Sequence, residues 1–275
     1  GALAASSRRA ARPQTEALAH YSRGVLFDNL GMLRKAVEAY EAFLEVARAL
    51  RDPVLEALAY NCLGVDCMLL AFGESEPVYD GTLELGPKGA AAMEAAARHH
   101  TAHLYAADEA GGCVAHTNLG LCRSALGDPA EAARHHQEAL RRALRTQSLG
   151  AQGLAVGNLG LLALRQGDAS TARACLEQHL QLVQGLQDPQ AEVNAWTHLG
   201  ELALQGPDGV PAAEGGADPA EAARCYEQAA RLCEREGLRA TLRRLNCLVG
   251  RARARRRMDA FLAERAAEAA NVYLG

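Results

Sequence analysis

Small and apolar residues recur along the chain at spacings that suit paired helices. A Leu-Gly pair occurs at 119–120 and again at 199–200. Each pair lies ahead of the same segment, Asp-Pro-Ala-Glu-Ala-Ala-Arg, found at 128–134 and at 218–224. Self-similarity at a fixed spacing is the sequence signature of a solenoid, in which short helical units stack on one another. Solenoids typically present extended binding surfaces.

One glycine, the anchor glycine, marks each predicted unit. The intervals between successive anchors are 40, 56, 40, 40 and 50 residues, whereas the spacing from a small residue in the second helix to the next anchor stays at 24 or 28 residues. The long intervals therefore contain loop insertions, at 72–88 and 205–217, between the two helices of a unit. The anchors are Gly24, Gly64, Gly120, Gly160, Gly200 and Gly250.

Local residues explain why helices would pair here. A glycine in one helix and an alanine in the next let two antiparallel helices approach closely. Gly31, Gly127 and Gly167 are placed to end first helices, where a positive φ is usually needed. Asp128 and Pro129 then supply an N-cap and a first-turn proline for the second helix. The pattern predicts an all-α chain of about six helix-turn-helix units.

The segment 118–140, Asn-Leu-Gly … Leu-Gly-Asp-Pro-Ala-Glu-Ala-Ala … His-His-Gln-Glu-Ala-Leu, resembles the tetratricopeptide repeat. The resemblance covers about residues 15–258, with an N-terminal extension at 1–14 and a capping helix at 259–275. It implies a right-handed superhelix, or α-solenoid, whose concave groove holds a peptide or a partner's helix. The 40-residue period is similar to LGN/Pins polarity adaptors and kinesin light chains, and segments 23–31 and 115–120 are similar to ciliary repeat proteins.

Composition supports a helical chain and limits its partners. Aromatic residues make up only 4%, and the net charge of −4 gives no overall case for nucleic acid. The eight cysteines form no CxxC and suit buried free thiols in a reducing compartment. No apolar run approaches 18 residues, so we expect no membrane span. We expect a cytoplasmic location, with the cilium or axoneme as a narrower alternative.

The resemblance implies that the first helix of each unit lines the groove, mainly at positions −3, +1, +4 and +5 from the anchor. Peptide-binding relatives often have Asn at +1, and this chain has none there, so chaperone C-terminal tails are not expected as ligands. An apolar groove favours an amphipathic helix or an extended segment of a partner protein. The alternative is that the chain's own terminal helix, or tight curvature, fills the groove. The predicted groove residues are Asp28, Asn29, Val65, Met68, Leu121, Leu161, Leu164, Arg165 and Glu201.

A run of arginines distinguishes the C-terminal part of the array. Eight arginines lie between 239 and 257 with no acidic residue among them. Arg244, Arg251 and Arg255 share a helix face at the predicted end of the groove. This basic end predicts an acidic protein partner; RNA fits less well because no aromatic residues interleave for base stacking. The alternative is a solvated polar cap on the solenoid.

Candidates for catalysis and for metal binding are lacking. His99 and His103 are one helical turn apart, but no further ligands accompany them, so we predict core histidines and neither metal nor cofactor. No phosphate-binding loop or nucleophile elbow occurs. We predict a non-catalytic scaffold with no small-molecule substrate. The alternative is a regulatory or targeting domain of a longer enzyme-containing chain, or of an enzyme complex.

Overall fold

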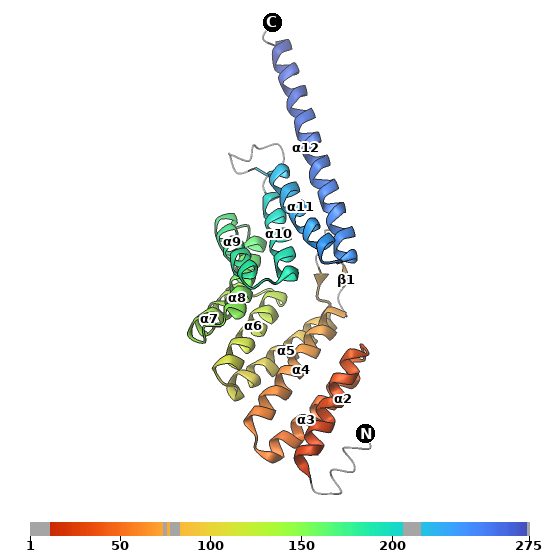
Figure 1. Ribbon diagram of the computed structural model, residues 1–275, viewed down its shortest axis with the longest axis vertical. Coiled ribbons are helices and arrows are strands. Elements are labelled where there is room, and N and C mark those ends of the chain that lie inside the picture. Colours follow the sequence, from red (N-terminus) through yellow and green to blue (C-terminus); the bar gives the residue numbers. More distant parts are fainter. Residues whose placement is uncertain (1–11, 74–75, 78–82, 206–215, 274–275) are drawn as a thin grey trace. The chain divides into compact units, whose positions relative to one another are not determined.

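The structure is a computed structural model that describes residues 12–73, 76–77, 83–205 and 216–273 (Figure 1). These ranges contain eleven helices and one short antiparallel strand pair. The chain divides into two compact units, residues 1–151 and 152–275. Helices that follow one another in sequence pack as pairs, which confirms the all-α prediction and is consistent with a tetratricopeptide α-solenoid.

The described part of the first unit contains six helices in three pairs. Between the two helices of the middle pair, β1 (Glu76–Pro77) pairs with β2 (Leu83–Glu84), with Glu76 opposite Glu84. The helices are α2 (Pro13–Asn29), α3 (Leu33–Leu50), α4 (Pro53–Gly73), α5 (Pro87–Ala106), α6 (Glu109–Ala125) and α7 (Pro129–Arg145).

In the second unit, the residues that the structure describes form two further pairs and a long last helix. The helices are α8 (Leu149–Gln166), α9 (Ala169–Gly185), α10 (Pro189–Ala203), α11 (Pro219–Arg235) and α12 (Arg239–Tyr273).

Local sequence accounts for where the helices begin and end. The carboxylate of Asp128 accepts a hydrogen bond from the backbone N–H of Glu131 at 3.1 Å, and Asp218 caps α11 in the same way. Gly31, Gly127 and Gly167 have φ of 68°, 80° and 75°, as expected for glycines that end a helix. The predicted caps and stops are therefore confirmed at these positions.

The anchor glycines are where paired helices touch. A Cβ added to Gly24, Gly64, Gly120 or Gly200 would lie 2.3 to 2.5 Å from a ring on the second helix of the pair, and one added to Gly160 would lie 3.0 Å from Leu176. At the first four glycines a Cβ would overlap the ring unless the ring moved, whereas at Gly160 the neighbouring leucine would have to shift only slightly. The facing side chains are Tyr40, His100, His136, Leu176 and Tyr226.

The sixth unit differs from the prediction. Residues 239–273 form a single helix, so the expected boundary between 258 and 259 falls inside α12, and no second helix follows it among the described residues. Residues 251–265 contain neither Gly nor Pro and are rich in Arg and Ala, so nothing in this stretch ends the helix. Gly250, the sixth anchor, has no side chain within 4 Å of an added Cβ.

By length and composition alone, α4 could cross a membrane, although Glu56 and Asp66 interrupt its apolar sequence. Ala59, Leu63 and Ala71 of this helix are fully buried in the first unit. A buried core helix meets the same two criteria, so the feature by itself does not indicate a membrane protein.

Matched glycine substitutions test the helix contacts. Gly120→Ala should lower the free energy of unfolding by about 1–3 kcal/mol because its methyl group would overlap the His136 ring. Gly250→Ala should raise it by about 0.5–1 kcal/mol, because alanine favours the helix and meets nothing there. Urea unfolding of both variants measures the difference. Shifts of the same sign would contradict the assigned contacts.

Two of the facing side chains are histidines without a complete set of partners. His100 and His136 are 0% and 2% exposed, and neither ring nitrogen of His100 has a hydrogen-bond partner. Burial, and to a smaller degree neighbouring histidines, lowers the pKa of His100 to about 3 and that of His136 to about 4. Both rings are therefore neutral in the folded protein at neutral pH.

Acid should destabilise the protein through these rings. Below pH 6.5 the unfolded chain takes up protons that the buried rings do not, so each histidine should lower the free energy of unfolding by about 1.4 kcal/mol per pH unit until its folded pKa is reached. His100→Leu, which copies Leu176 in the equivalent place, should remove one such contribution. Urea unfolding at about pH 7 and pH 5 measures the slope. An unchanged slope in the variant would show that His100 is not buried neutral.

Candidate functional site

In the first unit, the predicted groove residues separate into surface and core. Val65 and Leu121 are each 37% exposed, and Asn29 is exposed at the end of α2. Met68 is only 9% exposed and belongs to a core cluster, so it offers little surface to a partner. A residue four positions after the anchor lies on nearly the same helix face as the anchor, and that face is buried between helices.

The second unit repeats this division. Leu164, again four positions after an anchor, is 7% exposed and lies in the core, so it too offers little surface to a partner. Leu161 is half-buried, and Arg165 is exposed at the end of α8. Glu201 is half-buried and its carboxylate lies 2.9 Å from Nδ1 of His198.

Leu161 opens onto a pocket of about 160 Å³ formed by α8, α9 and α10, here called the α8–α10 pocket. Its apolar lining includes Leu161, the fully buried Leu176 and the exposed Leu154. Gly157 leaves room for His179, which is 9% exposed and lies 2.8 Å from the backbone oxygen of Gly153. The remaining lining residues are Asn158, Ala191, Asn194 and His198.

Apart from the buried His179, the polar side chains of this pocket come from two neighbouring first helices. Asn158 on α8 is half-buried and Asn194 on α10 is exposed, and neither carboxamide makes a hydrogen bond within the described part of the chain. Each carboxamide offers both donors and an acceptor, the groups that pair with a peptide backbone. His198 is oriented by Glu201. The arrangement suits binding of an extended peptide whose apolar side chain enters the pocket.

Burial keeps the nearby imidazole uncharged. Desolvation lowers the pKa of His179, although its hydrogen bond to the Gly153 carbonyl opposes this shift. A carbonyl oxygen only accepts, so Nδ1 of the neutral ring carries the proton. The pocket therefore has an uncharged floor, and no group of three or more His, Cys, Asp or Glu among the described residues could hold a metal ion.

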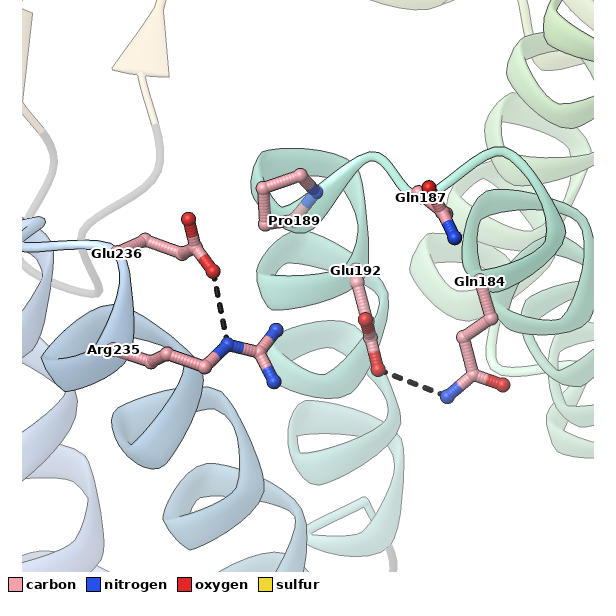
Figure 2. A pocket seen from close by; sticks show the side chains of 6 residues that line it. All are labelled: Gln184, Gln187, Pro189, Glu192, Arg235 and Glu236. Carbon is pink, nitrogen blue, oxygen red and sulfur yellow. Dashed lines mark hydrogen bonds and ion pairs between the residues drawn. The ribbon is translucent and has the colours of Figure 1, made fainter.

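A second cleft of about 370 Å³ lies near the ends of α9 and α11 and the start of α10 (Figure 2). Its polar side chains partner one another. The Gln184 amide donates to Glu192 at 2.9 Å, and Arg235 donates to Glu236 at 2.9 Å. Since these four groups already bond one another, they are less available to a ligand than the carboxamides of the α8–α10 pocket.

Asp28, predicted in the groove, is half-buried and lies near a second, buried carboxyl group in the first unit. Its Oδ2 accepts a hydrogen bond from the Tyr40 hydroxyl at 2.6 Å, and the nearby carboxyl group is that of Asp66, which is 2% exposed. Burial, and to a smaller degree the nearby charge of Asp28, raises the pKa of Asp66 to about 7. Asp66 therefore holds a proton close to neutral pH.

Removing this carboxyl should stabilise the protein at high pH. The folded pKa of Asp66 lies above its ordinary 3.8, so stability is lost as pH rises toward 7. Asp66→Asn should raise the free energy of unfolding by about 1–3 kcal/mol above neutral pH and by much less at acid pH. The exposed Glu45→Gln on α3 serves as the control. Chemical unfolding across the pH range measures both variants. An effect of Asp66→Asn that does not change with pH would contradict the raised pKa of Asp66.

The predicted basic end is only partly free. Arg244 and Arg251 are exposed on α12. Arg255 instead is half-buried and donates to the backbone oxygen of Leu204 at 3.4 Å, while Arg253 forms an ion pair with Glu227 at 2.8 Å. Arg255 thus helps to hold α12 against the end of α10.

Tetratricopeptide repeat family models match the chain over residues 17–50 and 115–148. The first match falls on the α2–α3 pair and the second on the α6–α7 pair. The chain thus contains tetratricopeptide repeats, which are generally protein–protein interaction modules and typically non-catalytic. A comparison with curated proteins found no match.

The predicted site missed Asn158, Asn194 and His198. A signal was present, because Asn118 and Asn158 both precede a Leu-Gly pair, two positions before an anchor. In the first unit, the Asn118 amide donates to the side chain of Asn61 at 3.4 Å, so that position is also polar and half-buried there.

Proposed function

We propose that the protein is a non-catalytic interaction scaffold and that the α8–α10 pocket receives an extended segment of a partner protein. The observation that supports this most directly is the pair of unpartnered carboxamides, Asn158 and Asn194, beside an apolar floor. An extended segment can use the carboxamides and the apolar floor together. Its backbone can form hydrogen bonds with the carboxamides, and one of its apolar side chains can pack against Leu161 and Leu176.

The chemistry of the pocket defines the segment that would fit. A volume of about 160 Å³ suits one aliphatic side chain of the partner. The neutral His179 and the amides provide no charge to pair with a charged side chain. An uncharged segment with a Leu-like or Val-like residue is therefore the expected ligand.

The setting of this scaffold is part of the proposal. The 40-residue anchor spacing, similar to that of LGN/Pins adaptors and kinesin light chains, favours a cytoplasmic or cytoskeletal assembly. The ciliary axoneme is a narrower form of the same proposal, supported by the likeness of segments 23–31 and 115–120 to ciliary repeat proteins.

The double variant Asn158→Ala/Asn194→Ala tests the pocket. Both side chains lie outside the core, so the fold should be retained, while the loss of backbone hydrogen bonds should weaken partner binding by about tenfold or more. Quantitative affinity capture from cell extract, with the variants compared protein by protein, measures the change.

Leu161→Glu should have a larger effect because it places a charge on the pocket floor. Leu186→Glu is its matched control, since Leu186 is 42% exposed at the end of α9 and does not line the pocket. If folded pocket variants capture every partner as the parent does, another surface carries the function.

A further inference from the structure

One side of α12 has no covering element among the described residues. The helix contacts α11 through Leu245, Val249 and Ala252, which are 1%, 7% and 0% exposed. Cys247, Ala254 and Phe261 lie seven residues apart, share another helix side, and are all exposed. We call this side the outer face of α12; it is made up of Arg243, Arg244, Cys247, Gly250, Arg251, Ala254, Met258, Phe261 and Leu262.

Gly250 has no second helix packed against it among the described residues. The other anchor glycines each meet a side chain from the second helix of their own pair, at 2.3 to 3.0 Å from an added Cβ. Gly250 occupies the same repeat position but meets nothing within 4 Å. Since no second helix follows α12 in the described residues, the place that such a helix takes in the other pairs is open here.

The outer face is apolar toward its C-terminal end. Met258, Phe261 and Leu262 are 56%, 52% and 55% exposed, and they follow the i, i+3, i+4 spacing of a helix-binding stripe. Figure 1 shows this part of α12 continuing past α11, the helix on which its first half packs. Large side chains exposed together on one helix side mark an interaction surface.

Its charge is uniformly positive. Arg243, Arg244 and Arg251 on this face are exposed, as are Arg256 and Arg257 beside it, and none of the five forms an ion pair among the described residues. No acidic residue occurs from 239 to 258. Guanidinium groups bind carboxylates through paired hydrogen bonds, so the complementary surface is acidic.

We propose that the outer face of α12 docks an acidic amphipathic helix of a partner protein. The partner helix takes the place of a second helix, with a Leu, Tyr or His side chain against Gly250 and apolar residues over Met258, Phe261 and Leu262. Its flanking carboxylates meet Arg243 and Arg251. A helix fits better than RNA, because the arginine-rich stretch 239–257 contains no aromatic side chain on which a base could stack.

This proposal rests on the proposed function only in that the partner is a protein. The probe is a synthetic helical peptide of about 20 residues, with Leu at heptad a and d positions, one Tyr at the centre and Glu at the flanking positions. Fluorescence anisotropy should show that it binds the parent chain. The same peptide with Lys in place of Glu should bind at least about tenfold more weakly.

Gly250→Leu is the decisive variant. Nothing lies within 4 Å of an added Cβ at this position and leucine favours the helix, so the variant should melt no lower than the parent, yet its side chain should block close approach and weaken peptide binding by about tenfold or more. Arg243→Glu/Arg251→Glu should weaken binding in a salt-dependent way. Arg231→Glu, an exposed charge reversal on α11, is the matched control and should leave binding unchanged.

Several results would overturn the proposal. One is equal peptide binding by folded Gly250→Leu. Another is displacement of the peptide by a single-stranded RNA of about 20 nucleotides that binds more tightly. A dimer of the parent in sedimentation experiments that Gly250→Leu abolishes would assign the face to a second copy. The Asn158→Ala/Asn194→Ala variant should bind the acidic peptide normally, so failure at α12 and failure at the α8–α10 pocket can be told apart.

Discussion

The close contact between an anchor glycine and a bulky side chain of the next helix is the interaction on which each helix pair depends. At four anchors the facing group is an aromatic or imidazole ring that leaves no room for a Cβ, and at Gly160 it is Leu176. The missing side chain sets how near the two helix axes can come. The alanines and leucines around each contact, such as Ala132 and Leu119, are then buried because the helices are already close.

The sequence is sufficient for predicting structure where a single turn of the backbone requires one particular type of residue. The Asp N-caps and the positive-φ glycines follow from the chemistry of a single turn, and the anchors follow from their spacing. The sequence is less informative where the outcome depends on the direction of a side chain around the helix axis. Met68 and Leu164 were predicted to line the groove, but each is mostly buried, because a position four residues after an anchor lies near the buried side of the helix.

The remaining differences have a longer-range origin. His100 lies opposite Gly64 as Tyr40 lies opposite Gly24, but an insertion lengthens the separation from 16 to 36 residues, so the equivalence is harder to see in the sequence. Asn158 and Asn194 become one site only when α8 and α10 lie side by side in the second unit. The continuation of α12 past 258 reflects the absence of any residue that stops a helix.

The two proposed surfaces differ in their physical character. The α8–α10 pocket combines neutral amides with aliphatic side chains, so its interactions depend little on ionic strength. The outer face of α12 combines arginines with exposed apolar groups, so long-range attraction brings a partner close and apolar contact then retains it. Two such surfaces allow one chain to bind a pair of different proteins at once.

The insertions inside two helix pairs also affect the order in which the pairs form. The Gly120–His136 contact closes 16 residues of chain, whereas Gly64–His100 closes 36 and Gly200–Tyr226 closes 26. Closing the longer segments costs about 0.7 and 0.4 kcal/mol more in chain entropy. In the first unit the α6–α7 pair therefore has the lower contact order and should form before α4–α5, which can then fold against it.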